Sequence, residues 1–163
     1  MFGFKSKDDS EEAKQAAIAA AKKPVRETLS AMAMAQPDEA ERLSQRLKDY
    51  LSADKTLPME YKQKARERAR LLECNANMRA ADKVLHRAVQ LAAEEHMGER
   101  SKALGEARRY FSKASTLGAD QEWRKAFVRL SDTVLMTGGV HHAGPSRAKP
   151  APIAPPTPNR AKL

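Results

Sequence analysis

The sequence is poor in the side chains that usually build a large apolar core. Leucine, isoleucine, valine and phenylalanine together make up about 16% of the 163 residues, below the roughly 20% at which disorder becomes a concern. Aromatic residues amount to 5%. We therefore expect a thin, elongated helical core, filled largely by alanine and methionine and flanked by disordered ends. Part of its stability is expected to come from self-association or from a partner.

Cysteine and long hydrophobic runs are also nearly absent. The single cysteine, Cys74, excludes an intramolecular disulfide framework and every CxxC metal or redox motif. No run of about 18 apolar residues occurs, so we expect no membrane-spanning segment. Charged residues from Lys5 onward interrupt the beginning of the chain, which therefore lacks the apolar stretch of a signal peptide. These absences predict a cytoplasmic protein.

Signatures of catalysis and of metal binding are missing as well. The sequence contains no HExxH motif, no GxSxG motif and no phosphate-binding loop that ends in Gly-Lys-Ser/Thr. No pair of histidines or cysteines has zinc-finger spacing, and the carboxylates show only the spacing of ordinary helical ion pairs. The sequence therefore predicts a protein that is not an enzyme and that uses neither a metal nor a cofactor.

The chain does contain one spacing of small and large apolar residues that occurs twice. The two copies are Ala81, Leu85, Ala88, Leu91 and Ala107, Phe111, Ala114, Leu117. Residues at these offsets share one helical face, and small residues there let a neighbouring helix approach closely. The spacing predicts a helical hairpin. The expected core residues around it are Leu85, Ala88, Ala107, Phe111, Ala114, Trp123, Phe127 and Leu130.

The second copy resembles the second helix of a tetratricopeptide repeat, which places small, aromatic and small residues at these offsets before a helix breaker. The residues that follow, Trp123, Ala126, Phe127 and Leu130, resemble the opening of the next first helix. The resemblance covers roughly residues 81–134 and implies a concave groove that binds a peptide or a partner helix. The alternative is an ordinary helical bundle that uses alanines at close crossings.

Proline residues mark where several helices are expected to begin or end. A first helix starts at Ser10, and Pro24 is expected to stop or kink it. Pro37 and Pro58 each occupy a position that tolerates proline in a first helical turn, so each opens a further helix. The helix after Pro58 is expected either to break at the Asn75/Asn77 pair or to continue to about Met97.

Glycines and one aspartate delimit the remaining helices. Gly98 and Gly118 are expected to end the two helices of the hairpin, and Asp120 to cap the last helix. That last helix carries an apolar stripe that includes Ala126 and Val134. No segment shows the period-two alternation of strands. We therefore predict an all-α fold, either a small antiparallel helical bundle or a degenerate helical-repeat array.

Composition divides the chain into four parts. Residues 1–9 form a flexible N-terminus, 10–36 hold N-terminal helices that are expected to pack loosely, and 37–137 form the helical domain. Residues 138–163 are rich in proline and contain four basic and no acidic residues, so they are expected to form a disordered tail.

The densest basic run is Lys62, Lys64, Arg66, Arg68 and Arg70, within a chain of formal net charge +9. On a helix, Lys62, Arg66 and Arg70 lie on one border of the apolar face, whereas the other two residues lie on the opposite border. The run is therefore expected to form two solvated borders. As an alternative, these side chains could contact a nucleic-acid backbone without reading its sequence.

Together these features predict a non-catalytic adaptor, assembly or scaffold protein whose partner is another protein or a second copy. The first alternative is a basic helical protein on a nucleic-acid backbone. The second is a peripheral membrane protein that contacts anionic lipid through Phe2, Phe4 and nearby lysines. The chain ends in Ala161-Lys162-Leu163, which resembles a peroxisomal targeting tripeptide and would apply only in a eukaryote.

Overall fold

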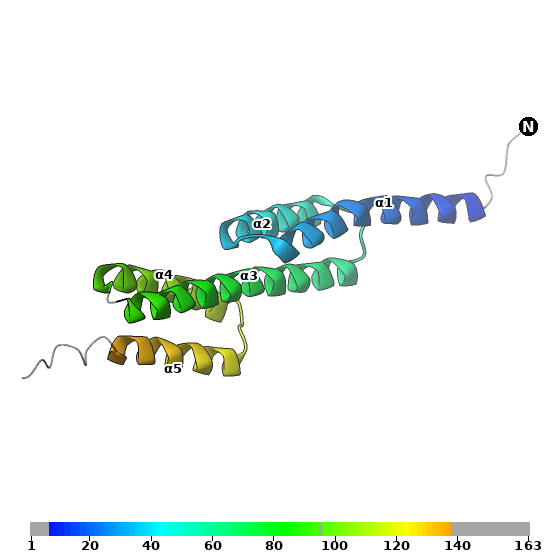
Figure 1. The fold of residues 1–163 in the computed structure, drawn as a ribbon. Helices are drawn as coiled ribbons and strands as arrows, with labels where there is room; N and C mark the ends of the chain where they lie inside the picture. Colours follow the sequence, from blue (N-terminus) through cyan, green and yellow to red (C-terminus); the bar gives the residue numbers. More distant parts are fainter. Residues whose placement is uncertain (1–6, 95, 138–163) are drawn as a thin grey trace, which may run out of the picture.

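The computed structural model describes residues 7–94 and 96–137, and these form five helices (Figure 1). The helices are α1 (Lys7–Met34), α2 (Pro37–Ala53), α3 (Met59–Ala93), α4 (Met97–Thr116) and α5 (Gln121–Thr137). Within the described ranges there is no strand. The predicted all-α, antiparallel helical fold is confirmed. The expected flexible N-terminus and proline-rich tail lie almost entirely outside the described residues.

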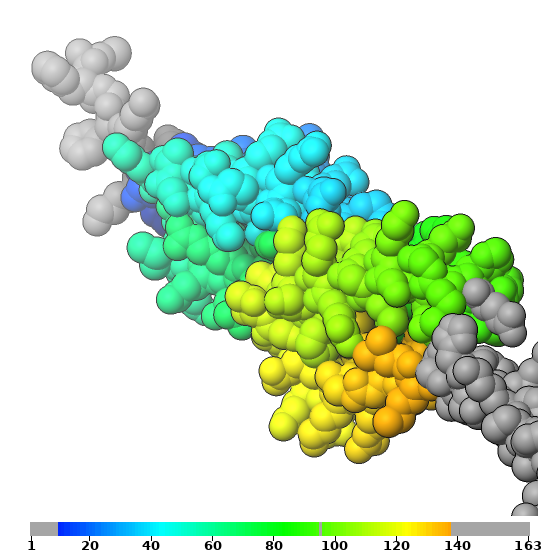
Figure 2. Space-filling view, turned by 90° about the vertical axis from the view of Figure 1, so that its left-hand side faces the viewer, coloured from blue at the N-terminus to red at the C-terminus, as the bar shows by residue number. Residues whose placement is uncertain are grey.

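The 35-residue helix α3 is the spine of the molecule and is about 52 Å long. Helices α1 and α2 pack along its first half, and α4 and α5 pack along its second half (Figure 1). Neither α1 nor α2 approaches α4 or α5 at the level of the backbone. Figure 2 shows the resulting elongated body, in which α2 (cyan) meets the end of α4 (yellow-green). There Lys113 Nζ lies 2.9 Å from Glu41 Oε2.

The first apolar cluster joins α1, α2 and the first half of α3. Val25 and Met32 of α1 and Leu51 of α2 are fully buried in it. The buried Lys62 donates a hydrogen bond from Nζ to the backbone oxygen of Asp54, in the turn between α2 and α3. The Asp54 carboxylate in turn accepts the backbone N–H of Leu57 at 2.7 Å. Through Val25 and Met32, the part of α1 after Pro24 packs into the bundle.

The second apolar cluster joins α3, α4 and α5. Ala81 and Ala88 of α3 and Ala107 of α4 are all fully buried in it, so the backbones of α3 and α4 approach closely. A smaller cluster continues this contact where Cys74 meets Ala114. The doubled small-residue spacing therefore describes the crossing of α3 and α4.

Pro24 does not stop α1, which continues through it to Met34. Because proline has no N–H, the carbonyl of Ala20, four residues before Pro24, loses its helical donor. In the same turn, the Tyr50 hydroxyl of α2 donates a hydrogen bond of 3.0 Å to the carbonyl oxygen of Ala21. A contact between helices, which local sequence does not reveal, thus supports the helix across the proline.

One boundary follows one of the two predicted courses, and another differs from the prediction. Helix α3 passes the Asn75/Asn77 pair without a break, as the second course expected, and Asn77 Nδ2 donates to the Glu73 backbone oxygen of its own helix at 2.9 Å. It ends at Ala93, before the expected stop, and Gly98 lies in the first turn of α4. A Cβ atom at Gly98 would meet nothing within 4 Å, so neither space nor conformation requires glycine at that position.

The end of α4 and the start of α5 follow the prediction. Gly118 closes α4 with a φ of 94°, a conformation that glycine adopts without strain. The Asp120 carboxylate then accepts the backbone N–H groups of Glu122 and Trp123, at 2.8 and 3.1 Å, and so caps α5. Ala126, which was expected on the apolar stripe of α5, is exposed.

Candidate functional site

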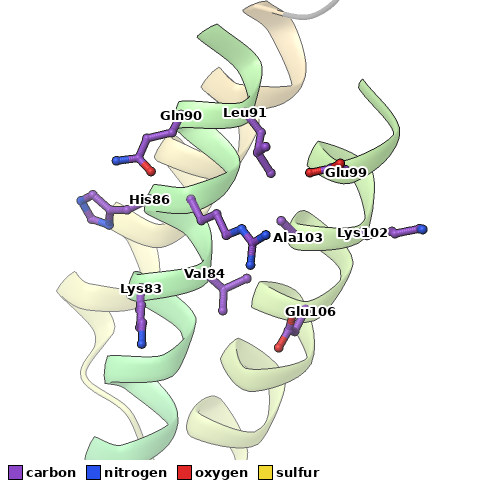
Figure 3. Close-up of a pocket in the computed structure, with 10 residues that line it drawn as sticks. Lys83, Val84, His86, Gln90, Leu91, Glu99, Lys102, Ala103 and Glu106 are labelled. Atoms are coloured by element: carbon purple, nitrogen blue, oxygen red, sulfur yellow. The ribbon is translucent and has the colours of Figure 1, made fainter. Parts of the chain in front are cut away.

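A groove runs between the second half of α3 and the first half of α4 (Figure 3). Its volume is about 860 Å³, and no residue of α5 lines it. We define the α3–α4 groove by its ten lining residues, Lys83, Val84, His86, Arg87, Gln90, Leu91, Glu99, Lys102, Ala103 and Glu106. The groove therefore follows the same helical hairpin that the alanine spacing predicted.

The floor of the groove is apolar. Val84, Leu91 and Ala103 point between the two helices (Figure 3), and Leu91 and Ala103 are only 8% and 7% exposed. Because Ala103 is small, a segment bound in the groove can come close to the α4 backbone. The floor suits the apolar face of a peptide helix, since such recognition uses anchors of this kind at helical spacing.

The rim of the groove is charged. Lys83 and Arg87 lie one turn apart on α3, and Glu99, Lys102 and Glu106 lie on α4. None of these five side chains makes an ion pair with another residue in the described part of the chain. His86 Nδ1 lies 2.7 Å from the Asp82 backbone oxygen, within hydrogen-bond distance of its own helix. Three cations therefore face solvent beside two carboxylates.

The eight expected core residues lie at or near the contact of α3, α4 and α5. Leu85, Ala88, Ala107, Ala114 and Phe127 are buried, whereas Phe111, Trp123 and Leu130 are partly buried. The ring of Phe111 stacks on the rings of Phe127 and Trp123. Phe111 and Phe127 are 4.5 Å apart between ring centroids, and Phe111 and Trp123 are 5.5 Å apart. These residues hold the hairpin that carries the groove, and none of them lines it.

The structure does not bring the basic run together as one patch. Lys62 is buried and bonded to Asp54, and Lys64 Nζ lies 2.6 Å from Glu60 Oε1. Arg66 and Arg70 line a hollow of about 510 Å³ between α2, α3 and the end of α4, together with Lys48, Ser52, Glu67, Glu73 and Leu117. Arg68 is exposed outside this hollow. Within the hollow, the carboxylates of Glu67 and Glu73 offset part of the positive charge.

Cys74 is buried against α4, and its thiol Sγ lies 3.5 Å from the backbone oxygen of Ala114. Burial raises the pKa of the Cys74 thiol, and nearby Arg70 only partly opposes this effect. A raised pKa disfavours the thiolate, which is the reactive form of cysteine. The environment of Cys74 is therefore that of a structural residue.

Among residues 7–94 and 96–137, no three His, Cys, Asp or Glu side chains gather in a way that could hold a metal ion. None of the described helices combines the length and the apolar character needed to cross a bilayer.

Sequence reasoning located the hairpin but assigned none of the groove's lining residues to a site. The alanine spacing shows which faces of α3 and α4 meet. It does not show which side of the pair α5 covers and which side stays open. No sequence pattern marks the residues of the charged rim, because isolated lysines, arginines and glutamates occur on every helix of this chain.

Comparison with protein-family models, with curated proteins and with solved structures gave no match. The resemblance to tetratricopeptide repeats therefore stays a prediction. Helix α3 alone, with 35 residues, is longer than the 34-residue helix–turn–helix unit of that family.

Proposed function

We propose that this protein is a non-catalytic interaction module, an adaptor or assembly protein, whose α3–α4 groove receives a helical segment of a partner protein. The observation that carries the proposal is the open groove of about 860 Å³, with an apolar floor and a charged rim, on an otherwise closely packed hairpin. Bundles commonly place ligand sites between helices, and an amphipathic segment would cover the floor while its charges meet the rim.

The shape of the groove supports a macromolecular partner over a small ligand. The groove is open along its length, and its lining on α3 extends from Lys83 to Leu91, about 12 Å or two helical turns. A small molecule that is bound tightly usually has most of its surface buried in an enclosed cavity. An open channel of this length is suited instead to two or three turns of a peptide helix.

Site-specific photo-cross-linking in a cell lysate tests this proposal. A photoreactive amino acid at Gln90, an exposed residue of the groove, is expected to give a discrete cross-linked product. The matched control places the same amino acid at Gln63, which is exposed on the same helix outside the groove. Arg87→Glu combined with the Gln90 probe should remove the product, while circular dichroism confirms that the helices remain.

The same experiment can contradict the proposal. If the Gln90 probe yields only the products that the Gln63 probe yields, the groove does not receive a protein segment, and the proposed interaction module loses its basis. A product that survives Arg87→Glu unchanged would show that the charged rim takes no part in the contact, which contradicts the proposed mode of binding.

A further inference from the structure

The first half of α1 extends beyond the bundle (Figure 1). Contacts with the body are seen at Ala21 and Lys22, where the Tyr50 hydroxyl donates to the Ala21 carbonyl and Lys22 Nζ lies 5.1 Å from the centroid of the Tyr61 ring. From Ser10 to Ala20 every residue is exposed except Ile18, which is partly buried. We call Ser10–Ala20 the N-terminal arm. It projects about 16 Å of helix without a partner.

The arm presents a face made only of small residues. Ala13, Ala16, Ala17 and Ala20 recur at offsets of three, four and seven residues, so they form one stripe along the helix. All four are exposed. A helix with such a face is narrow and can enter a space between two other helices more closely than a helix with large side chains.

The arm and the α3–α4 groove are complementary in charge and in size. The arm carries Glu11 and Glu12 next to its first residue, and Glu11 Oε2 lies 3.6 Å from Lys14 Nζ of the same helix. Glu12 borders the alanine stripe and makes no ion pair with another described residue. On its α3 side the groove presents Lys83 and Arg87 and no carboxylate, whereas Glu99, Lys102 and Glu106 lie on its α4 side. Its lining on α3 extends about 12 Å, close to the length of the arm. Because arm and groove lie at opposite ends of the molecule (Figure 1), one copy cannot fill its own groove.

From this complementarity we infer that the α3–α4 groove of one copy binds the N-terminal arm of a second copy. The stripe of Ala13, Ala16, Ala17 and Ala20 packs on Val84, Leu91 and Ala103, and Glu12 meets Lys83 and Arg87. The inference rests on the proposed function, because it names the partner segment for the same groove. Two copies side by side in opposite directions would fill both grooves, and copies joined head to tail would form a chain.

Sedimentation velocity of the full-length protein over a range of concentrations tests the inference. The wild-type protein is expected to form dimers or a longer series. Ala17→Arg places a large cation on the stripe and should weaken association about ten-fold or more. The matched control is Gln15→Arg, which adds the same side chain to an exposed position of the arm away from the stripe, and should leave association unchanged.

Charge reversal on both sides then identifies the contact. Glu12→Lys and Arg87→Glu should each weaken association, and the double variant should recover most of the loss, because the two charges attract again. A mixture gives a further test. Ala17→Arg retains a working groove and Arg87→Glu retains a working arm, so each is expected to be monomeric alone and to form a 1:1 pair with the other.

A wild-type protein that remains monomeric at all concentrations would overturn the inference. Self-association that Ala17→Arg and Gln15→Arg weaken equally, or a mixture that forms no pair, would overturn it as well. These outcomes are separate from failure of the proposed function. A monomeric protein whose Gln90 probe still captures another protein supports the groove as a binding site and rejects only the second copy as its occupant.

Discussion

The indole N–H of Trp123 donates to both carboxylate oxygens of Asp82, at 3.1 Å each, and so ties α5 to α3. Only three residues of α5 are buried, Phe127, Ser131 and Val134. A hydrogen bond to a charged acceptor therefore forms a substantial part of the attachment of this helix.

Replacement of Asp82 by alanine should loosen α5. The expected loss in the free energy of unfolding is about 1–2 kcal/mol, because the partly buried indole N–H loses its acceptor. Urea unfolding followed by fluorescence measures the effect directly, since Trp123 is the only tryptophan. Asp132→Ala, at an exposed position of α5, is the control and should change stability by less than about 0.5 kcal/mol. Equal unfolding midpoints for the two variants would contradict the prediction.

Tyr50→Phe should destabilise the region around Pro24. The substitution removes the donor to the Ala21 carbonyl, at an expected cost of about 0.5–1.5 kcal/mol. Amide hydrogen exchange should also show faster exchange in α1 before Pro24. Tyr61→Phe keeps the ring beneath Lys22 and removes a hydroxyl for which the described residues provide no hydrogen bond, so it serves as the control. Equal exchange rates in both variants would show that the Tyr50 hydroxyl does not support the helix.

Ala107→Leu should disrupt the crossing of α3 and α4. Ala107 is fully buried between closely packed helices, and overfilling such a site costs about 1–3 kcal/mol or more. Thermal unfolding followed by circular dichroism should show a lower midpoint. Ala126→Leu introduces the same side chain at an exposed position of α5 and should have little effect. If Ala107→Leu unfolds at the wild-type temperature, the two helices do not pack as closely as the structure shows.

The Cys74 thiol should resist modification in the folded protein. Because burial raises its pKa, the thiolate is scarce at pH 8, and labelling with a thiol reagent should be at least about ten-fold slower than in urea. A folded-state pKa above the unfolded one stabilises the protein below the ordinary thiol pKa. That contribution is lost as the pH rises through the folded value. The rate of labelling from pH 7 to 10 measures the reactivity of the thiol. Equal rates in buffer and in urea would contradict the predicted resistance to modification.

The nucleic-acid alternative makes a prediction of its own. If Arg66 and Arg70 contact a phosphate backbone, binding to DNA or RNA should weaken steeply as salt rises, and Arg66→Glu/Arg70→Glu should abolish it. The control is Lys64→Glu, whose ammonium is already paired with Glu60. An affinity that does not depend on salt, or no binding below about 0.1 M salt, would remove this alternative.

The sequence predicted most of the helices because their apolar residues recur at helical spacing and prolines mark their starts. It left the course of a helix open, or placed a residue on the wrong face, where tertiary contacts decide the outcome. At Pro24 the supporting group comes from Tyr50, 29 residues away from Ala21 in sequence. At Asn75 and Asn77 the packing of a long helix outweighs two weak helix formers. Ala126 has helical spacing but lies on the solvent side of α5, since the aromatic residues beside it set the contact.

The groove could not be predicted because it depends on where a third helix does not pack. Alanine spacing fixes the contact of α3 with α4 and is compatible with α5 on either side of the pair. The choice is made by interactions distant in sequence, such as Trp123 with Asp82 and Phe127 with Phe111. Only the folded arrangement leaves Val84 and Ala103 beneath an uncovered channel.

The shared spine has a consequence for how this chain loses its structure. Residues of the continuous helix α3 contribute to both apolar clusters. If the helices at one end unfolded, buried residues of α3 would become exposed, and the helix that the other cluster needs would be destabilised. In the described part of the chain, the two larger apolar clusters are joined by a single backbone element. We therefore expect the protein to unfold with heat or denaturant in one cooperative step. A chain whose two domains are joined by a linker would instead unfold in two steps.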